Sequence, residues 1–316
     1  MKHMKKSFFL CFPCLVILLT SCARQEHRLF SYFTGNGEDG LHLAGSENGY
    51  HWTVINDGDP LLAPEVGSAK LMRDPDITEG PEGLFHMVWT CGWNEKGIGY
   101  ASSGDLVNWS EQQYLPVMEH EPDARNCWAP EITYDPEYEQ FLICWSTTIP
   151  GRFPMTDSSS EDGYNHRIYY VTTNDFQDFS ETRLLYDKSF NVIDASIYPW
   201  EEGWFMLLKD ETLFPPEKNI RIAFADRATG PYSGPSNPIT GDYWAEGPTA
   251  IHLHGQWIVY FDKYREGAFG AVQSADLHQW QDISDQILFP EGVRHGTAFS
   301  VDKNVFRRLQ ALTNKE

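Results

Sequence analysis

The chain has few cysteines and few basic residues. Only 6 of its 316 residues are cysteine, and 24 Lys or Arg stand against 45 Asp or Glu, so the formal net charge at pH 7 is −21. Such a charge argues against nucleic-acid or anionic-lipid partners, which need basic patches. Three of the cysteines lie in the first 22 residues, and the other three show no CxxC spacing, which argues against a disulfide framework or a zinc site. At most one bridge can form among these three, and we expect buried free thiols at Cys91, Cys127 and Cys144.

The apolar run at residues 8–19 is too short to span a membrane. It follows a lysine-rich segment and has the length of a signal-peptide core. The letters LTSC that end it resemble a bacterial lipoprotein cleavage box. By that resemblance residues 1–21 are removed and Cys22 becomes the lipidated first residue; an ordinary signal peptide cut nearby is the alternative. We expect an exported protein, lipid-anchored in the periplasm or at the cell surface, with the lipid as its only attachment to a membrane.

A repeated pattern runs through the rest of the chain. Each copy has a hydroxyl residue, an Asp or Asn two positions later and an aromatic residue six positions later. Copies begin at Ser46, Ser103, Thr173 and Ser274, and a degenerate one begins at Ala225. The Asp or Asn suits a tight turn, and each copy follows short apolar strand patterns. Units of roughly 50 residues with four strands are typical of β-propeller blades.

The two ends of the chain supply the halves of one unit. Residues 294–301 look like the first strand of a new blade, but too little chain follows to complete it. Residues 29–33, 41–44 and 51–55 provide the missing strands. We therefore predict an all-β fold, a single five-bladed β-propeller over residues 22–316, closed by strands from both termini. A β-sandwich is the alternative, but it does not predict this divided unit.

An acid or a histidine stands near the start of every predicted innermost strand. These strands start together on one face of a propeller, so the five side chains should converge. The residues are Asp74, Glu131, Asp194, Glu246 and His295. Clustered carboxylates cost energy through like-charge repulsion, which favours a functional reason for them. Glycoside cleavage needs one ionised and one protonated carboxyl group; a metal site is the other reason to gather acids and stays open.

The motifs RDPDI, WAPEI, VIDASI, AEGP and RHGTAF, in this order, resemble glycoside hydrolase family 43. The resemblance covers nearly the whole chain after the leader and implies the five-bladed fold of arabinanases, arabinofuranosidases and xylosidases. It implies inversion of the anomeric centre, with Asp74 as general base, Glu246 as general acid and Asp194 orienting the acid and tuning its pKa. It requires no cofactor and places His295 on the axis, where a Ca²⁺ ion with His295 as its ligand is an open alternative.

Two features depart from the family pattern. Ala195 stands where family members usually have proline, and the triplet Arg73-Asp74-Pro75 also marks the related β-fructosidases. The aspartate nucleophile of β-fructosidases lies in an Asn-Asp-Pro motif near the N-terminus. The nearest match here, at residues 56–60, lies outside any innermost strand start, and we interpret it as a turn.

Aromatic residues beside these motifs are candidates for sugar contact, because the C–H faces of sugars stack on rings. We assign substrate binding to Trp93, Trp128, Glu131, Arg294 and His295. The leading hypothesis is an inverting, exo-acting α-L-arabinofuranosidase whose partner is a plant-type oligosaccharide or polysaccharide side chain. The exo assignment rests only on the compact loops; the longest insertion, at residues 150–163, could close one end of a groove. The alternatives are a β-xylosidase, galactosidase or fructosidase of the same fold, and a non-catalytic sugar-binding lipoprotein.

Overall fold

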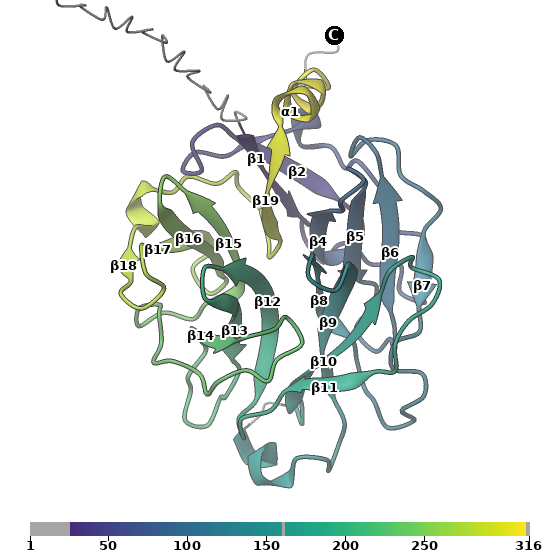
Figure 1. Ribbon diagram of the computed structural model, residues 1–316, viewed down its shortest axis with the longest axis vertical. Coiled ribbons are helices and arrows are strands. Elements are labelled where there is room, and N and C mark those ends of the chain that lie inside the picture. The colour runs from purple at the N-terminus through teal and green to yellow at the C-terminus, as the bar shows by residue number, and fades with distance from the viewer. Residues whose placement is uncertain (1–25, 160–161, 314–316) are drawn as a thin grey trace, which may run out of the picture.

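The computed structural model describes residues 26–159 and 162–313. Five antiparallel sheets stand around a central axis, which confirms the predicted all-β five-bladed propeller (Figure 1). The leader and Cys22 lie outside the described residues. Among the residues that are described, no helix is long and apolar enough to cross a membrane.

Three blades follow the predicted four-stranded plan, with the first strand innermost. Blade one contains β4 (Arg73–Glu79), β5 (Phe85–Thr90), β6 (Ile98–Ser103) and β7 (Gln113–Leu115). Blade two contains β8 (Trp128–Asp135), β9 (Gln140–Thr148), β10 (His166–Thr173) and β11 (Arg183–Tyr186). Blade four contains β15 (Glu246–Leu253), β16 (Gln256–Lys263), β17 (Ala268–Ser274) and β18 (Gln281–Asp282). Short 3-10 helices lie at Asn56–Gly58, Pro154–Ser159 and Ser284–Gln286.

Blade five is assembled from both ends of the chain, as expected. Its order is β19 (Thr297–Asp302), β1 (Glu26–Tyr32), β2 (His42–Ser46) and β3 (Thr53–Val54). β19 and β1 pair antiparallel over six residues, with Ser31 opposite Thr297. The ring therefore closes through backbone hydrogen bonds between strands from the two ends of the chain.

Blade three differs from the prediction, because it has three strands instead of four. These are β12 (Val192–Trp200), β13 (Gly203–Asp210) and β14 (Asn219–Ala225). The segment outside β14 contains Pro231, Pro235 and Pro238, which have no N–H to donate to a sheet. Its remaining amides still bond back to β14, for example Ser236 N to the Ile222 carbonyl at 2.8 Å. The expected outer strand is therefore an irregular edge.

The repeated sequence pattern forms a turn that joins the third and fourth strands of a blade. Asp105 Oδ1 accepts hydrogen bonds from the backbone N–H groups of Val107 and Asn108, at 3.0 and 2.7 Å. Asp175 and Asp276 make the same pair of bonds in blades two and four. The oxygen of a short side chain, two positions after the hydroxyl residue, therefore accepts hydrogen bonds from backbone N–H groups that have no backbone acceptor inside the turn.

A short helix that the sequence did not predict follows the last strand. Helix α1 (Lys303–Gln310) begins after Asp302, whose carboxylate accepts from the backbone N–H groups of Asn304 and Val305. Phe306 and Leu309 are buried, and the Phe306 ring stacks on His27 of β1 at 4.5 Å. The helix thus covers one end of blade five. Two turns are too few for an apolar periodicity to be recognised in the sequence.

The core lies between neighbouring blades, where apolar residues of facing sheets pack together. One such cluster joins blades one and two through Val88, Ile98, Ile132 and Phe141, all buried. The thiols of Cys91, Cys127 and Cys144 are free and buried, as expected from their sequence surroundings. Packing between blades fixes the five innermost strands relative to one another, and this positions the candidate site.

Candidate active site

Each of the innermost strands β4, β8, β12 and β15 has a β-bulge near its start. The bulge places one residue of each in the left-handed region: Asp74 at φ 51°, Ala129 at 45°, Asp194 at 54° and Gly247 at 58°. A non-glycine residue in this region costs roughly 1–3 kcal/mol and persists only where the surrounding structure holds it. The same cost is repeated in three blades. This indicates that the bulges have a role in aiming side chains at the end of the propeller axis where these residues lie.

The bulge corrects the sequence alignment of the five candidate residues. Asp74 and Asp194 are equivalent, and His295 holds the same place ahead of β19. Glu246 lies one position earlier, level with Arg73, because both stand first in their bulges. Glu131 lies two positions later than Asp74, level with Asp76. The sequence had suggested that the five side chains share one ring position, and the structure shows that they do not.

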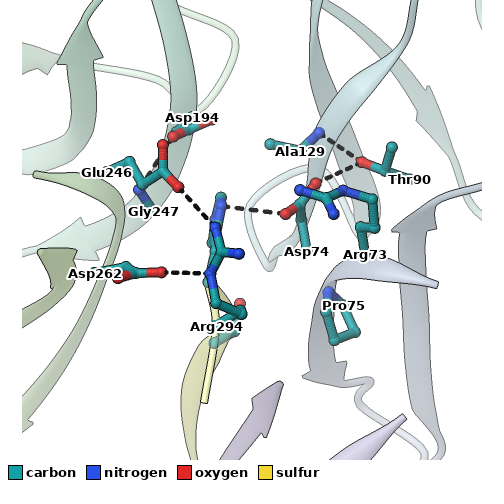
Figure 2. A network of polar contacts seen from close by, with 12 residues as sticks. Arg73, Asp74, Pro75, Thr90, Ala129, Asp194, Glu246, Gly247, Asp262 and Arg294 are labelled. Carbon is teal, nitrogen blue, oxygen red and sulfur yellow. Dashed lines mark hydrogen bonds and ion pairs between the residues drawn. The ribbon is translucent and has the colours of Figure 1, made fainter. Parts of the chain in front are cut away.

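Asp74 is held by a hydroxyl group and a histidine. Thr90 Oγ1 donates to Asp74 Oδ2 at 2.8 Å and itself accepts from the Ala129 N–H at 2.8 Å (Figure 2). His295 Nδ1 lies 3.4 Å from the other oxygen, Asp74 Oδ1. The carboxylate is thus fixed in orientation by neighbours in blades one, two and five.

Glu246 lies between two cations. Lys209 Nζ is 3.0 Å from Glu246 Oε2, and a terminal nitrogen of Arg294 is 3.6 Å from Oε1. Arg294 is held in turn by Asp262, whose Oδ2 accepts from Nε at 3.1 Å (Figure 2). The Glu246 side chain stays 21% exposed, so it remains accessible to a ligand.

Asp194 is buried beside Glu246. Its Oδ2 accepts from the backbone N–H of Gly247 at 3.1 Å (Figure 2). Its own N–H donates to Ser146 Oγ at 3.2 Å. Burial raises the pKa of Asp194 to about 6, although His295 and Lys209 favour its charged form. Asp194 therefore acts on Glu246 through the Glu246–Gly247 peptide group, from whose N–H it accepts a hydrogen bond. With a pKa of about 6, Asp194 changes its charge at mildly acidic pH.

We expect kcat/KM to rise as the pH climbs through about 6, because Asp194 ionises there and the charged form is the stronger acceptor for Gly247. The Asp194→Asn variant should lack this limb of the pH profile. Asp262 is the matched control, since burial also raises its pKa to about 6. A limb that survives in Asp194→Asn but disappears in Asp262→Asn contradicts the assignment; initial rates from pH 4 to 8 distinguish the two.

Gly247 is required by its contact with His295. It has φ 58°, and a Cβ atom built on it would lie 2.4 Å from the imidazole ring of His295. The glycine therefore lets the ring pack against β15 while Nδ1 faces Asp74. The AEGP motif therefore has glycine at this position because a side chain there would collide with the His295 ring.

Aromatic side chains line the site near β4 and β8. Trp93 is 43% exposed and meets Trp128 edge to face at 5.4 Å. Trp128 Nε1 donates to the Trp93 carbonyl at 2.9 Å, and the Tyr164 ring lies 4.7 Å from the Trp128 ring. The two predicted sugar-binding tryptophans thus lie together, with one of them open to solvent. The Arg73 guanidinium packs on the Trp93 ring at 4.4 Å.

Glu131 lies deeper in the propeller than the other candidates. It lines a cavity of about 350 Å³ with Asp76, Tyr198 and Thr297. Burial, reinforced by the nearby Asp76 charge, raises the pKa of Glu131 well above its usual range. Burial also raises the pKa of Asp76 to about 6, although that carboxylate accepts a hydrogen bond from the Ile132 N–H. The structure therefore places Glu131 with Asp76, apart from the ring that contains Asp74 and Asp194.

Four supporting residues were missed by the sequence reasoning. Each stands opposite the bulge, on the second strand of its blade, and contacts a residue in or just before the innermost strand of the next blade. They are Thr90, Ser146, Lys209 and Asp262, which contact Ala129, Asp194, Glu246 and Arg294 in that order. A signal was present: each is the first polar residue after a five-residue run that is nearly or wholly apolar. We call these four the supporting positions.

No cluster of three candidate metal ligands surrounds His295 in the part of the chain that the structure describes. Within residues 26–159 and 162–313, no three His, Cys, Asp or Glu side chains are grouped so as to hold a metal ion. His295 contacts Asp74, but this pair has no third ligand. We therefore derive no step through an ion on the axis.

The arrangement suits acid and base catalysis by two carboxyl groups. Asp74 and Glu246 lie on opposite sides of the site, on strands of different blades (Figure 2). Their neighbours differ, because a hydroxyl and an imidazole hold Asp74 whereas a lysine and an arginine hold Glu246. Two carboxyl groups in unlike surroundings can take unlike protonation states, which is the requirement for paired acid and base roles.

Comparisons with known proteins identify the family and the fold. A family model described as "Probable glycosyl hydrolase domain" matches residues 25–305. An α-L-arabinofuranosidase of Bifidobacterium longum subsp. longum is 20% identical over an alignment of 198 positions, which covers 56% of this chain and 18% of that protein. The chain thus spans less than a fifth of the length of that curated relative.

Solved structures share the fold at low sequence identity. A thermostable family-43 glycoside hydrolase has a TM-score of 0.54 at 16% identity, over 71% of this chain and 78% of that one. The α-L-arabinofuranosidase from Lactobacillus brevis has a TM-score of 0.52 at 18% identity, over 67% and 72% of the two chains. At such identities the likeness shows the propeller fold.

Proposed function

Because the chain belongs to the glycosyl hydrolase family related to family 43, whose model covers residues 25–305, we propose that it hydrolyses glycosides with inversion of the anomeric centre. The observation that carries the proposal is the separation of Asp74 and Glu246 on two innermost strands, each carboxyl group with its own set of partners. Inverting glycosidases keep their two carboxyl groups roughly 6.5–9.5 Å apart, which leaves room for a water molecule beside the sugar.

In the proposed reaction Asp74 is the general base. It takes a proton from a water molecule that attacks the anomeric carbon, while Thr90 and His295 hold its orientation. Glu246 is the general acid and gives its proton to the departing glycosidic oxygen as the carbon–oxygen bond breaks. Asp194 holds the Gly247 peptide and so orients Glu246. Water adds to one face of the sugar as the aglycone leaves the other, so the configuration inverts.

For the substrate, we propose a terminal α-L-arabinofuranosyl group on a plant-type oligosaccharide or polysaccharide. Two of the proteins similar to this chain bear the name α-L-arabinofuranosidase. The exposed ring of Trp93 offers a stacking face for a sugar. The loop with the 3-10 helix at 154–159 supports exo action, since it bonds to a second loop through Leu213 N and the Ser159 carbonyl. Export with a lipid anchor at Cys22 belongs to the same proposal.

Two other functions are compatible with the fold. A β-xylosidase or galactosidase of this type would use the same acid and base, since pocket shape decides the sugar. A non-catalytic sugar-binding protein is disfavoured, because Asp74, Asp194 and Glu246 are all present and oriented by specific partners.

A panel of aryl glycosides tests the proposal. We expect 4-nitrophenyl α-L-arabinofuranoside to be hydrolysed faster than the β-xyloside, the β-galactoside and the fructoside. Proton NMR during the first turnovers should show β-L-arabinofuranose before mutarotation. A first product with the α configuration contradicts inversion, and no hydrolysis of any member contradicts a glycosidase function.

A further inference from the structure

Lys209 is a buried lysine whose ammonium group faces the candidate acid. It stands near the end of β13 in blade three, 4% exposed, and its Nζ lies 3.0 Å from Glu246 Oε2 in blade four. A second carboxylate, Glu211, lies 2.6 Å from the same nitrogen. Lysine is almost never fully buried unless it is paired, so the position is specific to these two partners.

The pair belongs to a line of six groups with alternating charge. Lys218 pairs with Glu211, and Glu211 pairs with Lys209. The line then passes from Lys209 through Glu246 to Arg294 and ends at Asp262. Three positive groups alternate with three acids, so the line carries no net charge when Glu246 is ionised. The Glu246 carboxyl group is the member that faces the proposed reaction.

Lys209 also occupies a supporting position. In blades one and two these positions hold neutral hydroxyl groups, Thr90 and Ser146. Lys209 is the only cation among the four, and the contact that it makes in the next blade is with the candidate acid itself. The Nζ atom is held further by the Tyr264 ring at 4.7 Å.

An ammonium group donates hydrogen bonds and cannot accept one. Glu246 Oε2 is therefore an acceptor towards Lys209 at 3.0 Å. The nearest Arg294 nitrogen lies 3.6 Å from Oε1, beyond hydrogen-bond distance, so Oε1 is the oxygen on which we place the carboxyl proton. When that proton passes to the departing oxygen, a negative charge forms on Glu246 beside the buried cation. An interaction that strengthens as the proton leaves stabilises the transition state more than the ground state.

We propose that Lys209 is a positioning residue for Glu246, which places the acidic proton on Oε1 and stabilises the carboxylate that forms when the glycosidic oxygen is protonated. This inference rests on the proposed glycosidase function. The bond between the anomeric carbon and the leaving oxygen breaks, Glu246 supplies the proton to that oxygen, and Lys209 keeps all of its own protons.

The test compares Lys209→Met with Lys218→Met as matched control. Both changes remove a buried cation that pairs with Glu211, but only Lys209 contacts Glu246. We expect Lys209→Met to lower kcat on an arabino-oligosaccharide by about 10–100-fold and on the 2,4-dinitrophenyl glycoside by less than about 3-fold, because dinitrophenolate needs little protonation. Lys218→Met should change both rates equally and by less than about 3-fold.

A variant that keeps a donor guards against misfolding. Lys209→Gln keeps a hydrogen-bond donor but no charge, and we expect a smaller loss with the same dependence on the leaving group. Equal losses on both substrates for Lys209→Met and Lys209→Gln, or the same pattern in Lys218→Met, would overturn the inference. Inactivity of the wild-type protein on every glycoside would instead overturn the proposed function.

Discussion

Glu246→Gln is expected to lower kcat on an arabino-oligosaccharide by about 10²–10⁴-fold, the usual contribution of general acid catalysis. The amide keeps the shape of the side chain but has no acidic proton for the glycosidic oxygen. The loss should shrink on the 2,4-dinitrophenyl glycoside, whose leaving group departs with little protonation. Steady-state rates on the two substrates give the result directly.

Glu131→Gln is the matched control for Glu246→Gln. Glu131 is also an acid near the start of an innermost strand, but the structure places it with Asp76 in the deeper cavity. We expect its replacement to change kcat by less than about 10-fold and without dependence on the leaving group. Full activity of Glu246→Gln on the oligosaccharide, or a leaving-group effect confined to Glu131→Gln, would show that the acid has been assigned wrongly.

Asp74→Asn is expected to lower kcat by about 10²–10⁴-fold on both the oligosaccharide and the dinitrophenyl glycoside. The attacking water must lose a proton whichever leaving group departs, so an activated substrate cannot compensate. Azide is a nucleophile that needs no base, so it should restore part of the rate on the dinitrophenyl glycoside. The product would then be a glycosyl azide of inverted configuration, which NMR identifies.

Asp76→Asn separates the base from its neighbour in the strand. Asp76 lies two positions further along β4 and accepts from the Ile132 N–H, so its replacement should mainly lower thermal stability. We expect Asp76→Asn to keep most of its activity at 25 °C and to gain nothing from azide. Azide rescue of Asp76→Asn, with Asp74→Asn unaffected, would move the base to the deeper position.

The sequence by itself determined the number and closure of the blades. The turn pattern that begins at Ser46, Ser103, Thr173 and Ser274 recurs because each turn needs a short acceptor side chain two positions later. The divided last unit followed from counting strands, and β19 pairs with β1 as expected. These features depend on local backbone chemistry and on strand order, both of which can be read along a single chain.

Local deviations from the repeat were harder to read. The absent outer strand of blade three follows from Pro231, Pro235 and Pro238, which were visible in the sequence but were outweighed by the regularity of the other units. Helix α1 depends on the capping carboxylate of Asp302 and on burial of Phe306 against blade five. Tertiary contacts supply most of the stability of so short a helix.

Only the tertiary structure decided which side chains meet at the site. The acids Asp74, Asp194 and Glu246 were identified from their motifs, but a bulge sets Glu246 one position away from the other two. The partners of the acids come from neighbouring blades: Lys209 reaches Glu246 from 37 residues away, and His295 reaches Asp74 from the far end of the chain. Such contacts depend on how separate sheets pack around the axis, and no periodicity along the sequence encodes that packing.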